Sequence, residues 1–597
     1  MNREQKRKAV KNKSQKILNN NIPENALYRA LSFHKNGELQ KAKVIYEKII
    51  QLEPNNSQVL NYLGVLKAQM GDNKSAISLI KKAVNLEPLN FKYLNNLGNT
   101  YRAFEQLDNA IDCYKRAIQA DKNSAEYHLN LGIALTEKGI IEEAIASLEK
   151  ALTINPNYQQ VNMALGDIFQ TQGKLDKAIS SYIKALSIDP KYSKNQNPNN
   201  FDALLSLGMA LYRRGNLKES QITYEQALEI NPHSTECLTN IAATFYEQGR
   251  VDIAEACYQA VVDLIPTSTD AHINLGFLLS QQEKYDEAIE CYKAALKQDQ
   301  NSVNAIAGLA EVFGKKSDWK TVFQLYQKIL KLDSNSADAY AKLGISLREI
   351  GKSKEAIPQF EKAISINNRH IKAYANLGLA LQDVGKQSEA KFIFDYSELV
   401  AKYQFTSIEG WQNLTAYNHD LKDYIVRHPT LLKNRPGKPI NKGSQTYEIF
   451  TDNTPVITAL RKKINSYLED YFSRFTSNSN YQFFNNIPLD WKLSGWAVVL
   501  ESEGFQSSHI HPESYCSGVY YIQVPNTIKE NNSEAGHLNF ETCFSSKLDM
   551  KNSDKYQVKP QAGLLVIFPS YFWHSTIPFI GDSERICISF NMVPVSS

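Results

Sequence analysis

The 597-residue chain has little cysteine, and its seven cysteines include no Cys-x-x-Cys pair. This scatter argues against a disulfide framework and against a structural zinc site, and it favours reduced thiols. No apolar run approaches the roughly 18 to 20 residues that a helix needs to cross a bilayer, and the basic N-terminus lacks the apolar core of a signal peptide. We therefore expect a soluble cytoplasmic protein without a membrane partner.

The chain also lacks an excess of charge of one sign. It has 67 basic and 63 acidic residues, a formal charge of +4, which argues against nucleic acid as a partner. Basic residues gather locally between Met1 and Lys16, where seven of them accompany one glutamate. We interpret residues 1–22 as a disordered basic tail, with a weak RNA or membrane contact as the alternative.

A chain of this length is too long for one core and predicts several domains or a repeat array. Residues 23–404 repeat with a period of 34 residues. A small residue marks each period, at Gly64, Gly98, Gly132, Gly166, Gly208, Ala242, Gly276, Ala310, Gly344 and Gly378. A second small residue, usually alanine, follows twelve positions later, and a bulky one, often Tyr or Phe, four positions after that. Lys191–Asn200 holds an eight-residue insertion, which we expect to form a polar loop.

Each period reads as two helices joined by a turn. Turn glycines stand at Gly37, Gly71, Gly139, Gly173, Gly215, Gly249, Gly351 and Gly385. Prolines close many units, at Pro54, Pro88, Pro156, Pro190, Pro232 and Pro266. This pattern resembles the tetratricopeptide repeat, in about eleven units. The resemblance implies an all-α superhelix with a concave groove that binds a protein or peptide.

An asparagine recurs in the first helix of several repeats, two positions before the small residue. These residues are Asn96, Asn130, Asn240, Asn274 and Asn376. A carboxamide can donate to and accept from a peptide backbone, so the row predicts a groove for an extended peptide. It resembles the asparagine ladder of O-linked N-acetylglucosamine transferases. The alternative is that Asn-Leu-Gly is a common way to build this helix.

Residues 405–490 read as a connecting segment, in which the repeat period has stopped. An amphipathic helix is predicted near Pro455–Phe475, and such a helix packs most simply on one face of a sheet. Turn-forming residues fill Asn434–Thr446, which we interpret as a loop or gate. Its Arg435, Lys438 and Lys442 could attract an acidic cosubstrate, although a solvated loop is the simpler interpretation.

Residues 491–597 change to two-fold alternation, which is typical of short strands. The predicted strands are Ser494–Leu500, Ser517–Val524, His537–Glu541, Gly563–Phe568 and Arg585–Val593. This density of strands and turns predicts a double-sheet jelly roll. In the last strand, Arg585 and Cys587 share a polar face while Ile586 and Ile588 share an apolar one. Such a strand lines a polar pocket and is covered outside by helices.

Three histidines carry the chemistry that we expect here. His509 and His511 are two residues apart before a strand, so both side chains can point to one side. His574 lies 63 residues beyond His511, after the apolar run that breaks at Pro569. A close pair with one distant histidine suits a ferrous site with three protein ligands and open positions.

These stretches carry a second resemblance. HIHPESYCSGVYYIQVP, PQAGLLVIFPSYFWHSTIPF and GDSERICISFN resemble the 2-oxoglutarate- and Fe(II)-dependent oxygenases, specifically those fused to tetratricopeptide repeats. The resemblance implies a double-stranded β-helix (jelly roll) and a hydroxylase that uses Fe(II) and 2-oxoglutarate. It implies His509, His511 and His574 as metal ligands, Arg585 as the anchor of the 2-oxoglutarate carboxylate, and Tyr521 as a second donor to it.

Position 511 departs from the family pattern, because histidine stands where an aspartate or glutamate is usual. Three neutral imidazoles leave the metal more positive, which still permits Fe(II) but changes its affinity and redox properties. The alternative ligand is Glu513, because His511-Pro512-Glu513 is itself a His-x-Glu pair. We favour the three histidines, because Glu513 falls in a predicted turn.

Two other functions remain open from the sequence. One is a cupin-like zinc or manganese enzyme, which would leave Arg585 unexplained. The other is a scaffold in which the repeats bind a partner and the oxygenase-like domain is inactive or senses the cosubstrate.

Overall fold

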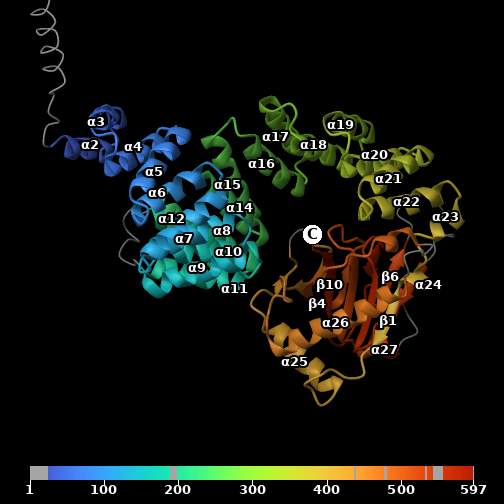
Figure 1. The fold of residues 1–597 in the computed structure, drawn as a ribbon. Helices are drawn as coiled ribbons and strands as arrows, with labels where there is room; N and C mark the ends of the chain where they lie inside the picture. The colour runs from blue at the N-terminus through green and yellow to red at the C-terminus, as the bar shows by residue number, and fades with distance from the viewer. Residues whose placement is uncertain are drawn as a thin grey trace, which may run out of the picture. The chain divides into compact units, whose positions relative to one another are not determined.

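The computed structural model describes residues 25–188, 198–435, 438–475, 481–530, 534–541 and 555–595. The chain forms two compact units, Met1–Lys194 and Asn195–Ser597, and each is described by itself (Figure 1). The predicted basic tail, Cys543 and most of the Lys191–Asn200 insertion lie outside the described residues.

The first unit is a series of paired helices. They are α2 (Ala26–Lys35), α3 (Leu39–Leu52), α4 (Ser57–Gln69), α5 (Asn73–Leu86), α6 (Phe91–Ala103), α7 (Leu107–Ala120), α8 (Ala125–Glu137), α9 (Ile141–Ile154), α10 (Gln159–Thr171) and α11 (Leu175–Ser187). Each helix packs on the next one along the chain, so the core is built from local contacts.

The second unit begins with further pairs of the same kind. They are α12 (Pro198–Arg214), α13 (Leu217–Ile230), α14 (Thr235–Glu247), α15 (Val251–Leu264), α16 (Thr269–Gln281), α17 (Tyr285–Gln298), α18 (Val303–Lys315), α19 (Trp319–Leu332), α20 (Ala337–Glu349), α21 (Ser353–Ile366), α22 (Ile371–Asp383) and the short α23 (Gln387–Lys391). The array was predicted to run to residue 404, whereas the last of these helices ends at Lys391.

The repeated glycines explain how the two helices of a pair approach each other. A Cβ on Gly98 would lie 2.6 Å from the ring of Tyr114, and one on Gly344 would lie 2.6 Å from Phe360. The aromatic residue therefore fills the space that the glycine leaves. Gly166, Gly208 and Gly378 meet Tyr182, Tyr224 and Phe394 in the same way.

The turns also follow the predicted pattern. All eight turn glycines have positive φ angles, between 70° and 90°, a region that costs other residues conformational energy. Three repeats lack this glycine and place Glu105, Glu283 and Ser317 at φ angles of 57°, 63° and 60°. In the described repeats, each closing proline comes two residues after the second helix ends, as Pro54 follows Leu52.

Beyond the repeats, the second unit contains two antiparallel sheets. The larger has the order β1-β8-β5-β10-β4-β3-β2 and the smaller the order β7-β6-β9. The strands are β1 (Ala401–Gln404), β2 (Leu432–Lys433), β3 (Ile440–Gln445), β4 (Trp491–Gln506), β5 (Cys516–Gln523), β6 (Leu538–Glu541), β7 (Lys555–Val558), β8 (Leu564–Pro569), β9 (His574–Thr576) and β10 (Arg585–Pro594). The predicted fold class, helical repeats followed by a jelly roll, is confirmed.

The five predicted strands correspond to β4, β5, β6, β8 and β10, but the larger sheet recruits more of the chain. Ile440–Gln445, predicted to lie in a loop, forms β3 and pairs with β4. Ala401–Gln404, predicted to belong to the repeats, forms β1 and pairs with β8. Both segments are short, and partners distant in sequence supply their hydrogen bonds.

Helices cover the outer face of the larger sheet. The predicted amphipathic helix is α26 (Pro455–Ser473), which buries Leu460, Ile464 and Leu468. Helix α25 (Leu414–Val426) lies against β5, where Tyr520 donates a hydrogen bond to Asn418 at 2.7 Å. On β10, Ile586 and Ile588 are fully buried in the core. The sheet therefore presents its other face, with Arg585 and Cys587, to the interior between the two sheets.

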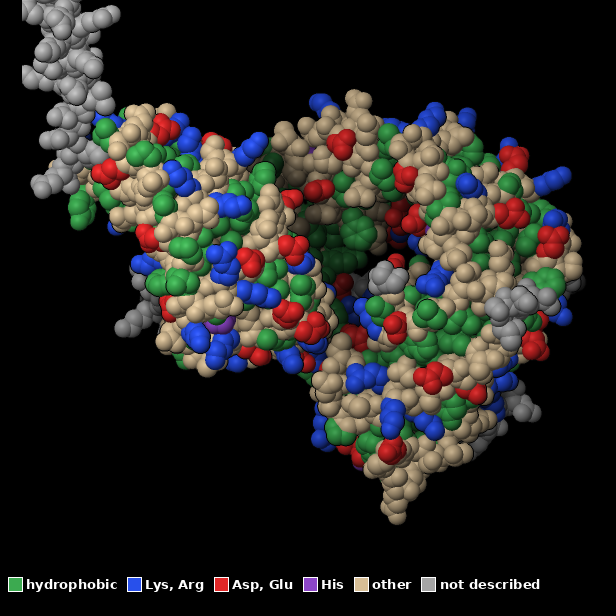
Figure 2. All heavy atoms as spheres, viewed as in Figure 1, with side chains coloured by type: hydrophobic (Ala, Val, Ile, Leu, Met, Phe, Trp, Pro, Cys, Tyr) green, Lys and Arg blue, Asp and Glu red, His purple; other side chains and the backbone are tan. Residues whose placement is uncertain are grey.

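No helix of the described residues combines the length and apolarity required to cross a bilayer. On the face shown in Figure 2, basic and acidic side chains are interspersed. This agrees with the near balance of charge in the sequence.

Candidate metal centre

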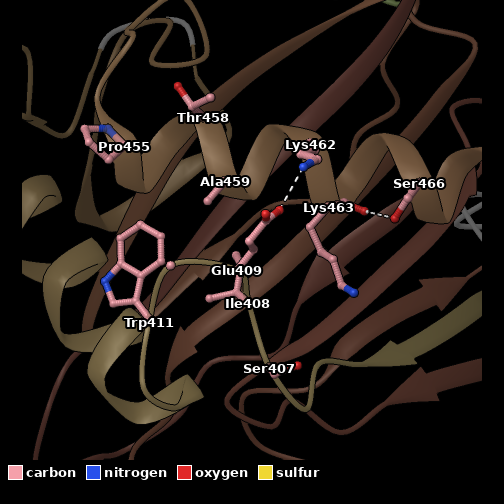
Figure 3. A pocket seen from close by; sticks show the side chains of 11 residues that line it. Ser407, Ile408, Glu409, Trp411, Pro455, Thr458, Ala459, Lys462, Lys463 and Ser466 are labelled. Atoms are coloured by element: carbon pink, nitrogen blue, oxygen red, sulfur yellow. Dashed lines mark hydrogen bonds and ion pairs between the residues drawn. The ribbon is translucent and has the colours of Figure 1, made fainter.

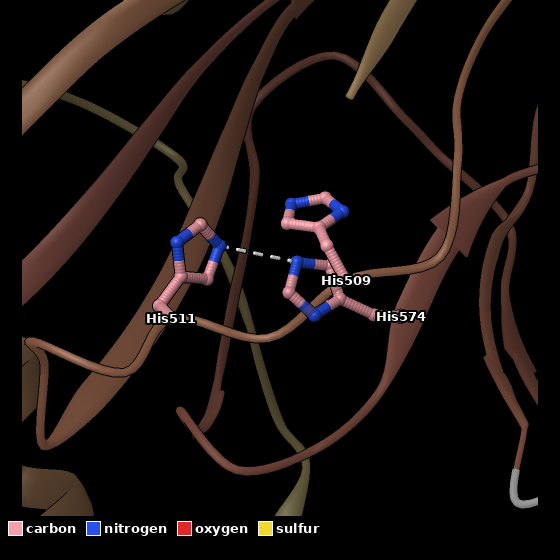
Figure 4. A group of neighbouring side chains, drawn as sticks. All are labelled: His509, His511 and His574. Atoms are coloured by element: carbon pink, nitrogen blue, oxygen red, sulfur yellow. Dashed lines mark hydrogen bonds between the residues drawn. The ribbon is translucent and has the colours of Figure 1, made fainter. Parts of the chain in front are cut away.

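Three imidazoles converge between the two sheets, although they come from distant parts of the chain. His509 and His511 follow β4, and His574 begins β9 (Figure 4). The ring centroids are 5.0 Å apart for His509 and His511, 4.4 Å for His509 and His574, and 5.1 Å for His511 and His574. One ligand atom from each ring lies within 4.8 Å of the others. Backbone hydrogen bonds of 3.1 Å in both directions between His509 and His574 fix this approach.

The surroundings select the neutral, metal-binding form of these rings. Nδ1 of His509 lies 2.7 Å from the carbonyl oxygen of Ser507, and Nδ1 of His574 lies 3.0 Å from that of Phe572. Each Nδ1 can donate its proton there, which leaves Nε2 as the ligand. Burial is the main cause that lowers the pKa of all three histidines, to about 3 for His511. The cluster is therefore uncharged at neutral pH, as metal binding requires.

Arg585 and Tyr521 line the same cavity as the three histidines. Arg585 is 1% exposed and Tyr521 is fully buried. The guanidinium lies 3.3 Å from the Tyr521 hydroxyl, and its Nε has no hydrogen-bond partner among the described residues. No carboxylate of the described residues pairs with it. Because an unpaired buried guanidinium is costly, this arrangement fits an anionic ligand.

Glu513, the alternative ligand, lies elsewhere. It is exposed in the turn after His511 and is not part of the histidine cluster. The Ser514 amide donates to the carbonyl of His511 across this turn at 3.1 Å. The turn directs Glu513 to the surface, while His511 faces the cluster.

The cavity around the cluster is also lined by residues other than the predicted ligands and anchors. Gln506, Cys587 and Ser589 line it, together with Trp496, whose ring centroid lies 5.7 Å from that of His511. The space measures about 20 Å³, so side chains must move apart to admit a dicarboxylate. Cys587 and Ser589 lie on the polar face of β10, whose alternation predicted a lined pocket. That alternation did not predict the part of the wall on β4, to which Gln506 and Trp496 belong.

A larger pocket of about 600 Å³ adjoins the cluster on the side of His509 and His511. Its wall includes Arg435 and Lys438 from the predicted gate segment, and Tyr447, which directly follows that segment. Arg435 is not solvated as expected, because it pairs with Glu247 at 3.3 Å and its side chain is only 10% exposed. Lys442 pairs with Glu503, away from the cluster.

Another pocket, of about 800 Å³, lies between residues 407–411 and α26 (Figure 3). Lys462 pairs there with Glu409 at 2.8 Å. None of the three histidines lines this pocket, so it contributes nothing to the metal centre.

The asparagines of the predicted peptide groove occupy different environments. Asn96 donates to Asn61 at 3.1 Å, and Asn130 donates to Asn95 at 2.9 Å, so both tie neighbouring repeats together. Asn376 is buried and donates to the carbonyl of Lys372. Asn240 and Asn274 are half-buried, and the Nδ2 of Asn240 has no hydrogen-bond partner among the described residues.

Comparison with known protein families identifies both regions. Residues 494–591 match the family described as "Putative 2OG-Fe(II) oxygenase". Tetratricopeptide repeat families match residues 24–56, 98–139 and 125–158. Residues 157–377 match the C-terminal domain of cilia and flagella-associated protein 70.

Solved structures also match this chain. MamA is 27% identical, with 28% of this chain and 96% of that chain covered and a TM-score of 0.26. YrrB, described as a TPR protein with an unusual peptide-binding site, is 22% identical over 32% and 95%, with a TM-score of 0.28. Yeast Tom70 is 14% identical over 68% and 96%, with a TM-score of 0.34. No curated protein matches the chain.

The assignment therefore depends on the family models and the residues themselves. The repeat period, with its glycines and aromatics, agrees with the repeat families. The stretch that matches the oxygenase family contains all three histidines, Tyr521 and Arg585. The chain combines tetratricopeptide repeats in its N-terminal region with a C-terminal domain of the 2OG-Fe(II) oxygenase family at residues 494–591.

Proposed function

We propose that the protein is a 2-oxoglutarate- and Fe(II)-dependent hydroxylase whose repeats recruit a polypeptide. The observation that carries this proposal is the buried, unpaired guanidinium of Arg585 in the cavity of the three histidines. A metal alone would not need this cation, whereas a dicarboxylate that binds both metal and guanidinium would need both. The cupin-like alternative leaves Arg585 without a role.

Different residues of the site would bind the metal, bind the cosubstrate and exclude water. Nε2 of His509, His511 and His574 would hold Fe(II), and the bound iron would supply oxygen activation and the oxidative decarboxylation of 2-oxoglutarate. Arg585 would take the distal carboxylate of 2-oxoglutarate, with the Tyr521 hydroxyl as a second donor. The apolar walls, among them Phe568 with its ring 4.8 Å from that of His574, would exclude water from the reacting groups.

The histidine at position 511 gives this site an all-nitrogen ligand set. Without a carboxylate the metal keeps its full positive charge, so an anionic cosubstrate gains more from binding to it. Arg585 lies on the neighbouring β10, where it can hold the other end of that anion. This set also suits zinc with a bound water, so metal content is part of the test.

The repeats would supply the polypeptide substrate. Tetratricopeptide repeats are protein-interaction modules, and stacked helix pairs offer a continuous binding surface. Asn240 and Asn274 are the asparagines that we propose for backbone contact, because no hydrogen bond to the described residues occupies their side chains. Asn96, Asn130 and Asn376 already bind other parts of the repeats. We therefore propose that they contribute less to binding of the peptide backbone.

The test is release of succinate by the purified full-length protein with Fe(II), 2-oxoglutarate and oxygen. His574→Ala should abolish both stoichiometric iron binding and succinate release. Arg585→Met should retain iron and raise the concentration of 2-oxoglutarate needed for half-saturation by about 100-fold, because a buried ion pair is lost. His419→Ala is the matched control, because His419 is an exposed histidine outside the cluster.

The outcomes separate the alternatives. Iron binding together with succinate release supports the hydroxylase. Stoichiometric zinc without succinate release contradicts it and favours a hydrolytic metalloenzyme. Absence of any bound metal in the wild-type protein leaves only the scaffold.

A further inference from the structure

Repeat helices α12 and α14 contact the segment that forms one wall of the pocket beside the histidines. All of these residues belong to the second unit. Glu247, at the end of α14, accepts hydrogen bonds from Arg435 at 3.3 Å and from the Tyr447 hydroxyl at 2.8 Å. The Arg435 guanidinium lies 3.5 Å above the Tyr447 ring. One repeat carboxylate therefore holds two residues of the pocket wall.

A second ion pair reinforces this contact. Arg214, at the end of α12, lies 2.5 Å from Asp452, and their side chains are 14% and 10% exposed. His428 lies 3.3 Å from the same carboxylate, and Tyr424 donates to it. These groups are largely shielded from water, so each charge depends on its partner more than a surface pair would.

A turn glycine gives independent evidence for close packing. Gly215 follows α12, and a Cβ there would lie 2.5 Å from the Tyr447 ring. Corresponding turn glycines, such as Gly173 and Gly351, have nothing within 4 Å of an added Cβ. All three have positive φ angles, so the turn itself requires glycine at each. At Gly215 the Tyr447 ring of the oxygenase segment occupies the space of the missing side chain as well.

Arg435 connects the two regions. It lines a cleft of about 630 Å³ whose other residues include Glu247 and Gly215 on the repeats. It also lines the pocket of about 600 Å³ that contains His509 and His511. Arg435 therefore lines both the cleft beside the repeats and the histidine pocket, and Tyr447, whose ring it covers, lines the histidine pocket next to it.

We propose that Glu247 is a positioning residue of the oxygenase pocket: it holds the wall formed by Arg435 and Tyr447, so the repeats determine the shape of the substrate entrance. That the pocket is a substrate entrance rests on the proposed function, whereas the contact between Glu247 and the wall does not. A polypeptide bound on the repeats near α14 would then act on the entrance directly. The repeats would be part of the substrate site and not only a tether.

The test is hydrogen–deuterium exchange of the metal-free, full-length protein, read by mass spectrometry over residues 440–450. The Tyr447 amide bonds to the Thr430 hydroxyl and the Thr446 amide to the carbonyl of Ala497, so both report on the wall. Glu247→Gln should speed their exchange at least about fivefold, because the wall opens more often. Exchange in α26 should stay unchanged, which excludes general unfolding.

Matched variants separate positioning from simple loss of stability. Glu219→Gln removes an exposed carboxylate that also lines the cleft and should change nothing. Gly215→Ala should speed exchange at Tyr447, whereas Gly351→Ala, with the same conformational cost but open space, should not. Each of the single variants Glu247→Arg and Arg435→Glu should speed hydrogen exchange at the wall. The double variant, in which the two charges are swapped, should restore slow hydrogen exchange.

A spectroscopic signal reports on the pocket itself. Trp496 lines the pocket. Its fluorescence emission is obtained by subtracting the spectrum of the Trp496→Phe variant from that of the otherwise identical protein. In Glu247→Gln, acrylamide should quench this emission at least about twofold more strongly. Unchanged exchange at residues 440–450 and unchanged quenching in Glu247→Gln would overturn the proposal. Because neither measurement uses metal or cosubstrate, failure of the hydroxylase test would leave both results interpretable.

Discussion

The repeats and the oxygenase sheets are stabilised by contacts of very different range along the chain. In the repeats, the aromatic that fills the space beside a glycine comes from the next helix, as Tyr182 does for Gly166. In the sheets, β10 lies between β4 and β5, and β8 pairs with β1 from before residue 405. Damage should therefore remain local in the repeats, whereas in the sheets it should reach the metal centre.

The largest expected effect comes from adding one methyl group to the larger sheet. In Gly518→Ala, the Cβ would lie 2.4 Å from the Phe590 ring and 2.5 Å from the carbonyl oxygen of Val566. The clash with the backbone oxygen can be relieved only if the whole strand β8 shifts. We therefore expect a loss of about 3 kcal/mol in the free energy of unfolding. Metal binding should weaken too. Denaturant unfolding and metal titration measure both; normal metal affinity would contradict long-range damage.

Metal removal should distinguish the two regions next. A metal bound at one hundred times its dissociation constant stabilises the folded state by about 2.7 kcal/mol. We expect a chelator to lower the unfolding temperature of the sheets and leave that of the repeats in the first unit unchanged, as followed by residue-specific exchange. His574→Ala should show no response to the chelator. An equal shift in both regions would mean that they unfold together.

Gly166→Ala is the repeat counterpart of the sheet variant. Its Cβ would lie 2.4 Å from the Tyr182 ring, but a ring edge can shift more easily than a backbone carbonyl. We expect a loss of about 1 to 2 kcal/mol, confined to the neighbouring repeats, with unchanged metal affinity. Exchange mapping should show the disturbance in α10 and α11. Spread of the disturbance to distant repeats would contradict the local character of the array.

The smallest effect concerns the cap of a single repeat helix. Asp318 caps α19 through the amide and hydroxyl of Thr321, and these hydrogen bonds hold its pKa below 3.8. The cap therefore stabilises the helix above that pH and loses its effect as pH falls through the lowered pKa. Asp318→Ala should cost about 0.5 kcal/mol at pH 7. Asp318→Asn should keep the cap and lose its pH dependence, as measured by unfolding at pH 7 and pH 3.

Much of the fold could be predicted because its signals are local. A period of 34 residues with glycine, alanine and aromatics at fixed positions predicts helix pairs without knowledge of distant contacts. Among the strands that were not predicted, β1 and β3 are short and gain their hydrogen bonds from β8 and β4. The prediction that Arg435 is a solvated loop residue is wrong. Its partner, Glu247, is 188 residues away in the sequence, so no local pattern indicates the pair.

The sequence by itself determined the repeat architecture, the strand pattern and the chemical nature of the candidate ligands, because side-chain size and period act over a few residues. The tertiary structure decided that three imidazoles meet within 4.8 Å, that Glu513 turns outward and that Arg585 is buried without a carboxylate. It also decided that repeat helices hold the pocket wall. These facts depend on which strands and helices pack together, and no local pattern of residues encodes that choice.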